Sequence, residues 1–257
     1  MRFMPRPEGE PFISYYNAGI YLLWPWFQAV TKRDWRGAEH LGKQGDGMVL
    51  AVNHMSWLDP LAVIHYINDN GRSVRVLAKA ELFDVPLGGR IIRGTHQIPV
   101  YRSSDDAAAA VSAAVDAVNG GECIMVYPEG TLTRDPDMWP MQGKTGAARI
   151  ALATRKPLVP AAQWGAQEIM PPYQLRFNAL PRKTMHVWAG EPVDLSDLYD
   201  REPTAQVLQA ATNRLMNAIT DLLSQIRGEP APAGRWDRRT GRREPIGPLR
   251  PVDEPPA

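Results

Sequence analysis

A histidine and an aspartate five positions apart are the residues of this sequence best placed to do chemistry. They are His54 and Asp59, at the two ends of the sequence HMSWLD. A carboxylate beside an imidazole fixes its tautomer and stabilises the cation formed when the ring takes up a proton, so such a pair works as a general base near neutral pH. Taken alone, Asp59 followed by Pro60 is equally typical of a helix N-cap, which leaves its role open between cap and catalytic partner.

Two other chemistries at the same stretch have weaker support. Ser56 lies between the pair, as a serine hydrolase would require, but no G-x-S-x-G elbow surrounds it. A metal centre is disfavoured because no second histidine or cysteine stands at ligand spacing from His54. We therefore expect neither a metal nor another cofactor.

Two later stretches also follow apolar runs. The sequence from Tyr127 to Arg134, YPEGTLTR, contains a Glu-Gly-Thr turn whose backbone N–H groups could face a substrate oxygen. The sequence from Gly94 to Arg102 brings an arginine to the end of a run, where it could bind a phosphate through two hydrogen bonds. In isolation, an ordinary turn and a surface arginine explain these two stretches as well.

The elements that must position these residues alternate along the chain. The apolar run 48–52 predicts a buried strand before His54, and residues 60–68 predict the helix after it. The remaining patterns predict strands at 74–77, 97–100, 123–127, 158–161 and 185–189, and helices at about 86–93, 105–119, 144–154 and 204–226. Such alternation is typical of an α/β fold with a mixed, largely parallel sheet flanked by helices.

The two ends of the chain differ from this pattern. Seven aromatic residues fall between positions 15 and 35, partly at helical spacing, and Lys32, Arg33 and Arg36 lie beside them. This predicts an amphipathic membrane-surface segment over residues 1–36, with packing onto the domain's own core as the alternative. Residues 37–228 form the predicted domain. Residues 229–257 hold seven prolines and an arginine cluster and are predicted to be a disordered tail.

Composition excludes several classes of protein. A formal net charge of +1 gives no basic surface for nucleic acid. No run of about 20 apolar residues is present, so no segment is predicted to span a bilayer. Prolines and acidic residues follow the first basic residues, unlike a signal peptide. The single cysteine, Cys123, lies in an apolar run and is expected to be a core residue, which fits a reducing compartment.

Taken together, the motifs resemble those of the glycerolipid acyltransferases of the 1-acyl-glycerol-3-phosphate type, the PlsC-like family. The stretch from Asn53-His54 to Asp59 is similar to the family's His-x4-Asp motif, and Gly94 to Arg102 is similar to its second motif. Tyr127 to Thr131 is similar to the third motif, and the pair Val159-Pro160 to the fourth. Lys79 matches a lysine found between the first two. The resemblance runs from about residue 35 to residue 192, with the motifs in the family's order.

The resemblance implies a reaction and a location. His54, oriented by Asp59, would deprotonate the hydroxyl of a lysophospholipid, and the oxygen would attack the thioester of acyl-CoA or acyl carrier protein with no acyl-enzyme. The substrate-binding residues implied are Lys79, Arg102, Glu129, Gly130, Thr131 and Arg134. The enzyme would work at the cytoplasmic face of the cell membrane, as a peripheral or monotopic protein.

One position departs from the family's pattern. Arginine usually follows Glu-Gly-Thr, but this chain has Leu132 there and Arg134 two positions later. The leading acceptor is 1-acyl-glycerol-3-phosphate, and the departure leaves another lysophospholipid as an alternative. A non-catalytic lipid-binding protein on the same scaffold is the alternative of a different class.

Overall fold

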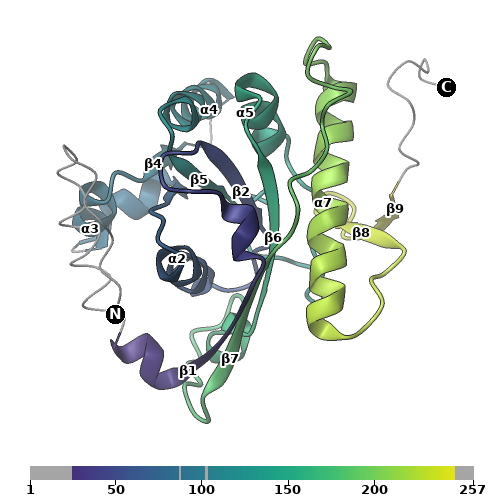
Figure 1. Cartoon of the computed structure of the whole chain (residues 1–257). Coiled ribbons are helices and arrows are strands. Elements are labelled where there is room, and N and C mark those ends of the chain that lie inside the picture. The colour runs from purple at the N-terminus through teal and green to yellow at the C-terminus, as the bar shows by residue number, and fades with distance from the viewer. Residues whose placement is uncertain (1–24, 87, 102–103, 247–257) are drawn as a thin grey trace.

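A seven-stranded sheet forms the centre of the computed structural model, which describes residues 25–86, 88–101 and 104–246 (Figure 1). The strand order is β1-β7-β6-β2-β5-β3-β4, and only the pair β6–β7 is antiparallel. The strands are β1 (Thr31–Arg36), β2 (Met48–Val52), β3 (Arg75–Lys79), β4 (Ile98–Val100), β5 (Cys123–Val126), β6 (Leu158–Trp164) and β7 (Lys183–Ala189). The predicted mixed, largely parallel α/β sheet is confirmed.

Helices cover both faces of this sheet. They are α2 (Asp59–Asp69), α3 (Gly88–Gly94), α4 (Ser104–Asn119), α5 (Gly146–Thr154), α6 (Ala166–Ile169) and α7 (Ala205–Arg227), with the 3-10 turns η1 (Ala38–Leu41) and η2 (Ala80–Asp84). One core cluster joins α2 to the sheet, and a second joins α4, α5 and α7 to its other face. Figure 1 shows α2 on one side of the strands and α7 on the other.

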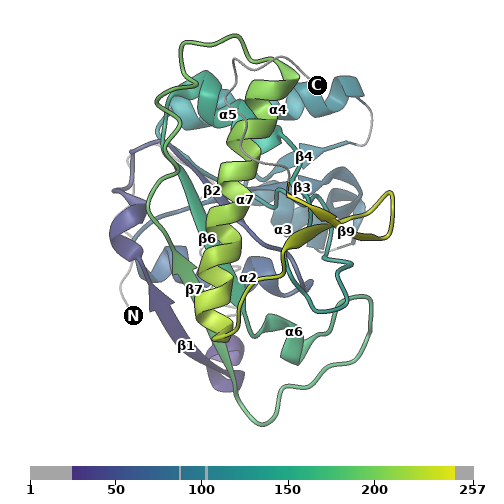
Figure 2. The ribbon, with the colours of Figure 1, turned by 90° about the vertical axis from the view of Figure 1, so that its right-hand side faces the viewer.

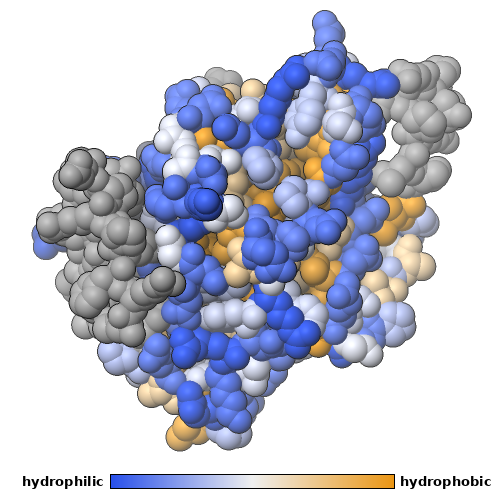
Figure 3. Space-filling view, viewed as in Figure 1, coloured by the Kyte–Doolittle hydropathy of each residue, from blue (hydrophilic) through white to orange (hydrophobic). Residues whose placement is uncertain are grey.

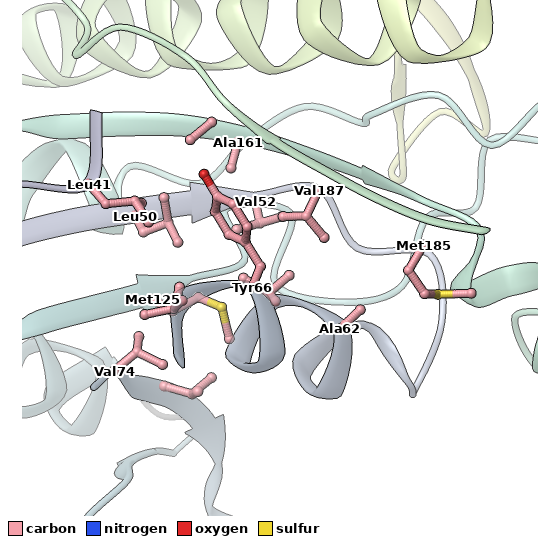
Figure 4. Close-up of a cluster of buried hydrophobic side chains, with 14 of the residues drawn as sticks. Leu41, Leu50, Val52, Ala62, Tyr66, Val74, Met125, Ala161, Met185 and Val187 are labelled. Carbon is pink, nitrogen blue, oxygen red and sulfur yellow. The ribbon is translucent and has the colours of Figure 1, made fainter. Parts of the chain in front are cut away.

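The central strands are apolar at every position because both faces are covered. All five residues of β2 are buried, as parallel strands between two helical layers require. Figure 4 shows one of these layers, in which Ala62 and Tyr66 of α2 pack below Leu50 and Val52 of β2. This packing fixes the end of β2, from which His54 follows.

The predicted disorder after residue 228 is wrong for residues 234–245. They form an antiparallel hairpin of β8 (Gly234–Asp237) and β9 (Arg242–Pro245), which Figure 2 shows beside α7. The low aliphatic content that predicts disorder is offset by polar contacts, because Arg235 is buried against α7 and Arg243 is paired with Asp135. Residues 247–257 lie outside the described residues.

The predicted N-terminal segment is described only from residue 25. Residues 25–30 are helical, and Phe27 lies in the core, so the core-packing alternative holds for this residue. Trp35 lies in β1 and packs edge-on against Tyr66. The predicted domain start at residue 37 is therefore too late, since β1 is a strand of the sheet. Among the helices of the described residues, none is both long and apolar enough to cross a bilayer.

Candidate active site

The candidate site lies at the edge of the sheet where the parallel strands end. Strands β2, β3 and β5 run in the same direction, so the residues that follow them meet at this edge. His54 follows β2, Glu129 follows β5, and the exposed Lys79 is the last residue of β3. Arg102, the predicted phosphate ligand after β4, lies outside the described residues.

His54 and Asp59 form the expected pair. The imidazole Nδ1 lies 2.8 Å from Asp59 Oδ2. The Asp59 side chain is fully buried, whereas 17% of the His54 side chain is exposed. Because a carboxylate only accepts hydrogen bonds, we assign the ring proton to Nδ1, which leaves Nε2 with a lone pair to take a proton from a substrate.

Asp59 also closes the turn that carries the histidine. Its Oδ2 accepts hydrogen bonds from the backbone N–H groups of Met55 at 2.6 Å and Ser56 at 2.8 Å. Both groups precede helix α2, and no side-chain cap is present at the start of this helix. In this structure the Asp59 carboxylate therefore does not cap α2; it shapes the turn that carries His54 and contacts the imidazole ring.

The backbone of His54 is held on both sides. Its N–H donates to Glu129 Oε1 at 2.9 Å, and its carbonyl accepts from the N–H of Thr133 at 2.7 Å. The imidazole stacks on the ring of Tyr127, with 4.0 Å between ring centroids and 21° between planes. These contacts restrict the rotation of the imidazole ring, of which only one part remains exposed.

The Glu129 side chain is buried and accepts hydrogen bonds from backbone N–H groups of the protein. It is 1% exposed, and its second oxygen accepts from the N–H of Met141 at 3.0 Å. Burial raises the pKa of the Glu129 carboxyl to about 8, against the lowering effect of the two backbone N–H donors. In this structure Glu129 positions the backbones of His54 and Met141, and its predicted part in the substrate site stays a prediction.

The Glu-Gly-Thr turn requires its glycine. Gly130 has φ +68°, and a Cβ at this position would lie 2.9 Å from the ammonium nitrogen of Lys144. The N–H of Gly130 donates to the carbonyl of Tyr127 at 2.9 Å, within the turn. Lys144 therefore brings a positive charge over the turn, while Thr131 beside it is half-buried.

Comparison with known proteins identifies the class of enzyme. The family model described as Acyltransferase matches residues 32–164, more than half of the chain, and this range contains His54, Asp59 and Glu129. The chain belongs to this acyltransferase family.

Among its relatives is the 1-acyl-sn-glycerol-3-phosphate acyltransferase of Bacillus subtilis, 26% identical over 70% of this chain and 83% of the relative. An uncharacterized protein of Mycobacterium tuberculosis is 28% identical over 62% of this chain, which spans 45% of that protein. The fold matches the crystal structure of the 1-acyl-sn-glycerophosphate (LPA) acyltransferase PlsC of Thermotoga maritima. The TM-score is 0.60 at 18% identity, over 86% of this chain and 80% of that chain.

The position after Glu-Gly-Thr is turned inward in this acyltransferase. Leu132 is 3% exposed, and its carbonyl accepts a hydrogen bond from the Tyr173 hydroxyl at 2.8 Å. Arg134 is exposed instead, and lines an open hollow of about 440 Å³ together with Met138, Pro172 and Tyr173. The first arginine after the turn in the sequence is thus two residues farther along than the family pattern expects.

Two groups at the candidate site were given no role from the sequence. Lys144 is 14 residues beyond Gly130, and no local pattern marks it. Asn53 precedes His54 and forms two hydrogen bonds with the backbone of Gln163 in β6, at 2.8 Å and 3.1 Å. The position of Asn53 directly before the histidine was the only sequence feature that indicated a role, and its pairing with β6 could not be predicted from the sequence.

Proposed function

We propose that the protein transfers a fatty acyl chain from a thioester to the free hydroxyl of a lysophospholipid. The observation that carries the proposal is the His54–Asp59 pair, in which the buried carboxylate holds Nδ1 and leaves Nε2 at the exposed edge. Family membership supplies the reaction class, and the histidine supplies the base.

The chemistry needs no covalent enzyme intermediate. Nε2 of His54 takes the proton of the acceptor hydroxyl as its oxygen attacks the thioester carbonyl carbon. The tetrahedral intermediate then expels the thiolate, which takes the proton from Nε2 and leaves as a free thiol, with an ester as the other product. The Asp59 carboxylate stabilises the imidazolium that exists between these steps.

The oxyanion and the acceptor phosphate both need positive charge or N–H donors. The N–H of Gly130, which the resemblance implies would hold the oxyanion, is bonded within its own turn. We therefore assign the stabilisation of the oxyanion to the ammonium group of Lys144, which lies over the turn. Lys79 stands at the same edge, at the end of β3. Arg134, in the loop after β5, and Arg102, which lies outside the described residues, complete the proposed set of cations.

The proposed acceptor is 1-acyl-glycerol-3-phosphate, and the product is phosphatidic acid. The names of the Bacillus subtilis and Thermotoga maritima proteins support this choice. The buried Leu132 supports the alternative of another lysophospholipid, since it is an uncharged side chain at the position where the family pattern has an arginine that could bind a phosphate. The donor is proposed to be acyl-CoA or acyl carrier protein.

A product assay tests the reaction. Purified protein is mixed with a panel of acyl thioesters and lysolipids, and the products are identified by mass spectrometry. We expect an ester product that disappears in His54→Ala and persists in His40→Ala, a control histidine in η1. Undiminished turnover in His54→Ala would overturn the assignment of the base. Lipid binding without any product would support the non-catalytic alternative.

We further propose peripheral association with the cytoplasmic face of a membrane. Strand β6 runs parallel to β2, so it ends at the edge of the sheet where His54 lies. Strand β7 is antiparallel to β6 and β1 is parallel to β7, so both strands start at this edge. The segments after β2, β3, β4 and β6, and the segment before β1, therefore lie at the same edge as His54. Every exposed large hydrophobic residue of the described part lies in these segments: Trp26, Trp57, Leu82, Val85, Tyr101, Tyr173, Leu175, Phe177 and Leu180. Apolar and aromatic side chains around a lipid-handling site are suited to insertion at a bilayer surface.

The exposed loop between α6 and β7 allows a direct test of this surface. Leu175 and Leu180 are 94% and 78% exposed. Figure 3 shows hydrophobic colour at the lower tip of the molecule and also, among hydrophilic residues, over the middle and right-hand side of this face. Replacing both leucines by serine should weaken sedimentation with phospholipid vesicles about tenfold or more, because each buried leucine contributes roughly 1.5–3 kcal/mol. Unchanged sedimentation would place the membrane contact elsewhere, for instance in residues 1–24, which lie outside the described residues.

A further inference from the structure

The C-terminal hairpin lies against the loop that follows the Glu-Gly-Thr turn. We refer to residues 133–142 as the support loop. The N–H of Gln142 donates to the carbonyl of Trp236 in β8 at 3.1 Å, and Met141 and Trp236 form a parallel β-bridge. Residues about 100 positions apart are thus joined through their backbones next to the active site.

The support loop in turn holds His54 from both sides. At its start, the N–H of Thr133 donates to the His54 carbonyl at 2.7 Å. Near its end, the N–H of Met141 donates to one oxygen of Glu129 at 3.0 Å, and the other oxygen accepts from the N–H of His54 at 2.9 Å. A displacement of this loop would therefore move the backbone of the proposed base.

Arg243 of β9 fastens the support loop through two carboxylates. Its guanidinium binds both oxygens of Asp135, at 2.7 Å and 2.5 Å, and Asp137 Oδ2 at 2.7 Å. The Asp135 side chain is 1% exposed, so the ion pair with Arg243 offsets the cost of removing this carboxylate from water. The N–H of Asp135 donates to the hydroxyl of Thr133 at 3.2 Å, which links the ion pair to the residue that holds His54.

The hairpin is itself anchored on α7. Arg235 of β8 is 5% exposed and donates to the side-chain and backbone oxygens of Asn213, at 3.3 Å and 3.2 Å, and to the side chain of Asn217. At the end of the helix, Arg227 donates to the carbonyl of Asp137 at 2.7 Å. The support loop is thus tied to a long helix packed along β6, both directly and through the hairpin.

We propose that the C-terminal hairpin is a positioning element of the active site, in which Arg243 acts through Asp135 and the support loop to set the place of His54. Arg243 is not proposed to touch substrate. The hairpin lies beyond the residues that the acyltransferase family model covers, which end at 164. The kinetic part of the test rests on the proposed function, whereas the exchange part below does not.

The kinetic test compares two arginines of the hairpin. Arg243→Gln removes the ion pairs to the support loop, whereas Arg239→Gln changes an arginine that is 87% exposed and pairs with Asp237 inside the hairpin turn. We expect kcat to fall about tenfold in Arg243→Gln with KM for both substrates within about twofold, since a misplacement of about 1 Å can cost roughly 10²-fold. Arg243→Lys should restore part of kcat. Equal kcat in Arg243→Gln and Arg239→Gln would overturn the proposal.

Amide hydrogen exchange tests the same link without any substrate. We expect faster exchange at the N–H groups of His54, Thr133 and Met141 in Arg243→Gln, with the amides of β2 and β5 unchanged. Should Arg243→Gln fail to fold, Asp137→Ala removes one of the three bonds at a residue that is 61% exposed, and should give a smaller change of the same kind. Unchanged exchange at these three amides would overturn the proposal, whatever the substrates of this enzyme are.

Discussion

Replacing Asp59 by asparagine separates the charge of this residue from its shape. Three N–H donors converge on Asp59 Oδ2, from the His54 ring and from the backbones of Met55 and Ser56. An asparagine would place its carbonyl oxygen there, because its NH2 group would face three donors. The ring proton therefore stays on Nδ1, and the substitution removes only the negative charge beside the imidazolium.

The size of the effect follows from this geometry. Two unit charges about 4 Å apart interact by about 4 kcal/mol at an effective dielectric constant near 20. Partial exposure of His54 reduces this to about 3 kcal/mol, and at about 1.4 kcal/mol per decade the expected loss in kcat is roughly 100-fold. KM should change little, because neither residue is proposed to bind the ground-state substrates.

Thiol release with a coloured reagent provides the assay. The chain's single cysteine, Cys123, is buried, and burial raises the pKa of its thiol to about 12, so it will not compete for the reagent. Asp69→Asn, at the other end of α2, is the matched control. If Asp59→Asn keeps more than about a third of the wild-type kcat, the carboxylate does not stabilise the imidazolium and the reasoning fails.

Three further predictions concern the surroundings of the base. Glu129 has a folded-state pKa of about 8 against an ordinary 4.5, so between these two pH values the folded protein holds a proton that the unfolded protein has lost. The free energy of unfolding should therefore fall by up to about 1 kcal/mol per pH unit as the pH rises through this range. Urea titrations of Glu129→Gln should lack this slope, and equal slopes in the two proteins would contradict the prediction. Gly130→Ala should lower both the melting temperature and kcat. Gly71→Ala, with a similar φ of +77° and nothing within 4 Å of its Cβ, should lower only the melting temperature. Equal kcat losses in the two variants would show that the contact with Lys144 is unimportant. Asn53→Ala should destabilise the fold by about 2–3 kcal/mol in chemical denaturation, because it leaves the buried backbone groups of Gln163 without partners, and a change below about 0.5 kcal/mol would refute this.

The local patterns that predict most of the fold are short-range properties of the chain. A strand buried on both faces must be apolar at every position, so β2 and β5 are visible as continuous runs, and the helices between strands show their own periodicity. Strand β1 was missed because it carries charged residues along an edge of the sheet, in the sequence TKRDWR. Its pairing with β7, 152 residues later, is a long-range contact that no local pattern encodes.

The sequence by itself determined the proposed base and its proposed partner. His54 and Asp59 lie in one turn, so five residues of local geometry are enough to bring Nδ1 to within 2.8 Å of the carboxylate. Only the tertiary structure decided the place of Glu129, Thr133 and Arg243. Their roles depend on backbone pairing and on ion pairs between segments 75 to more than 100 residues apart, and these form only when burial makes an unpaired charge or N–H costly.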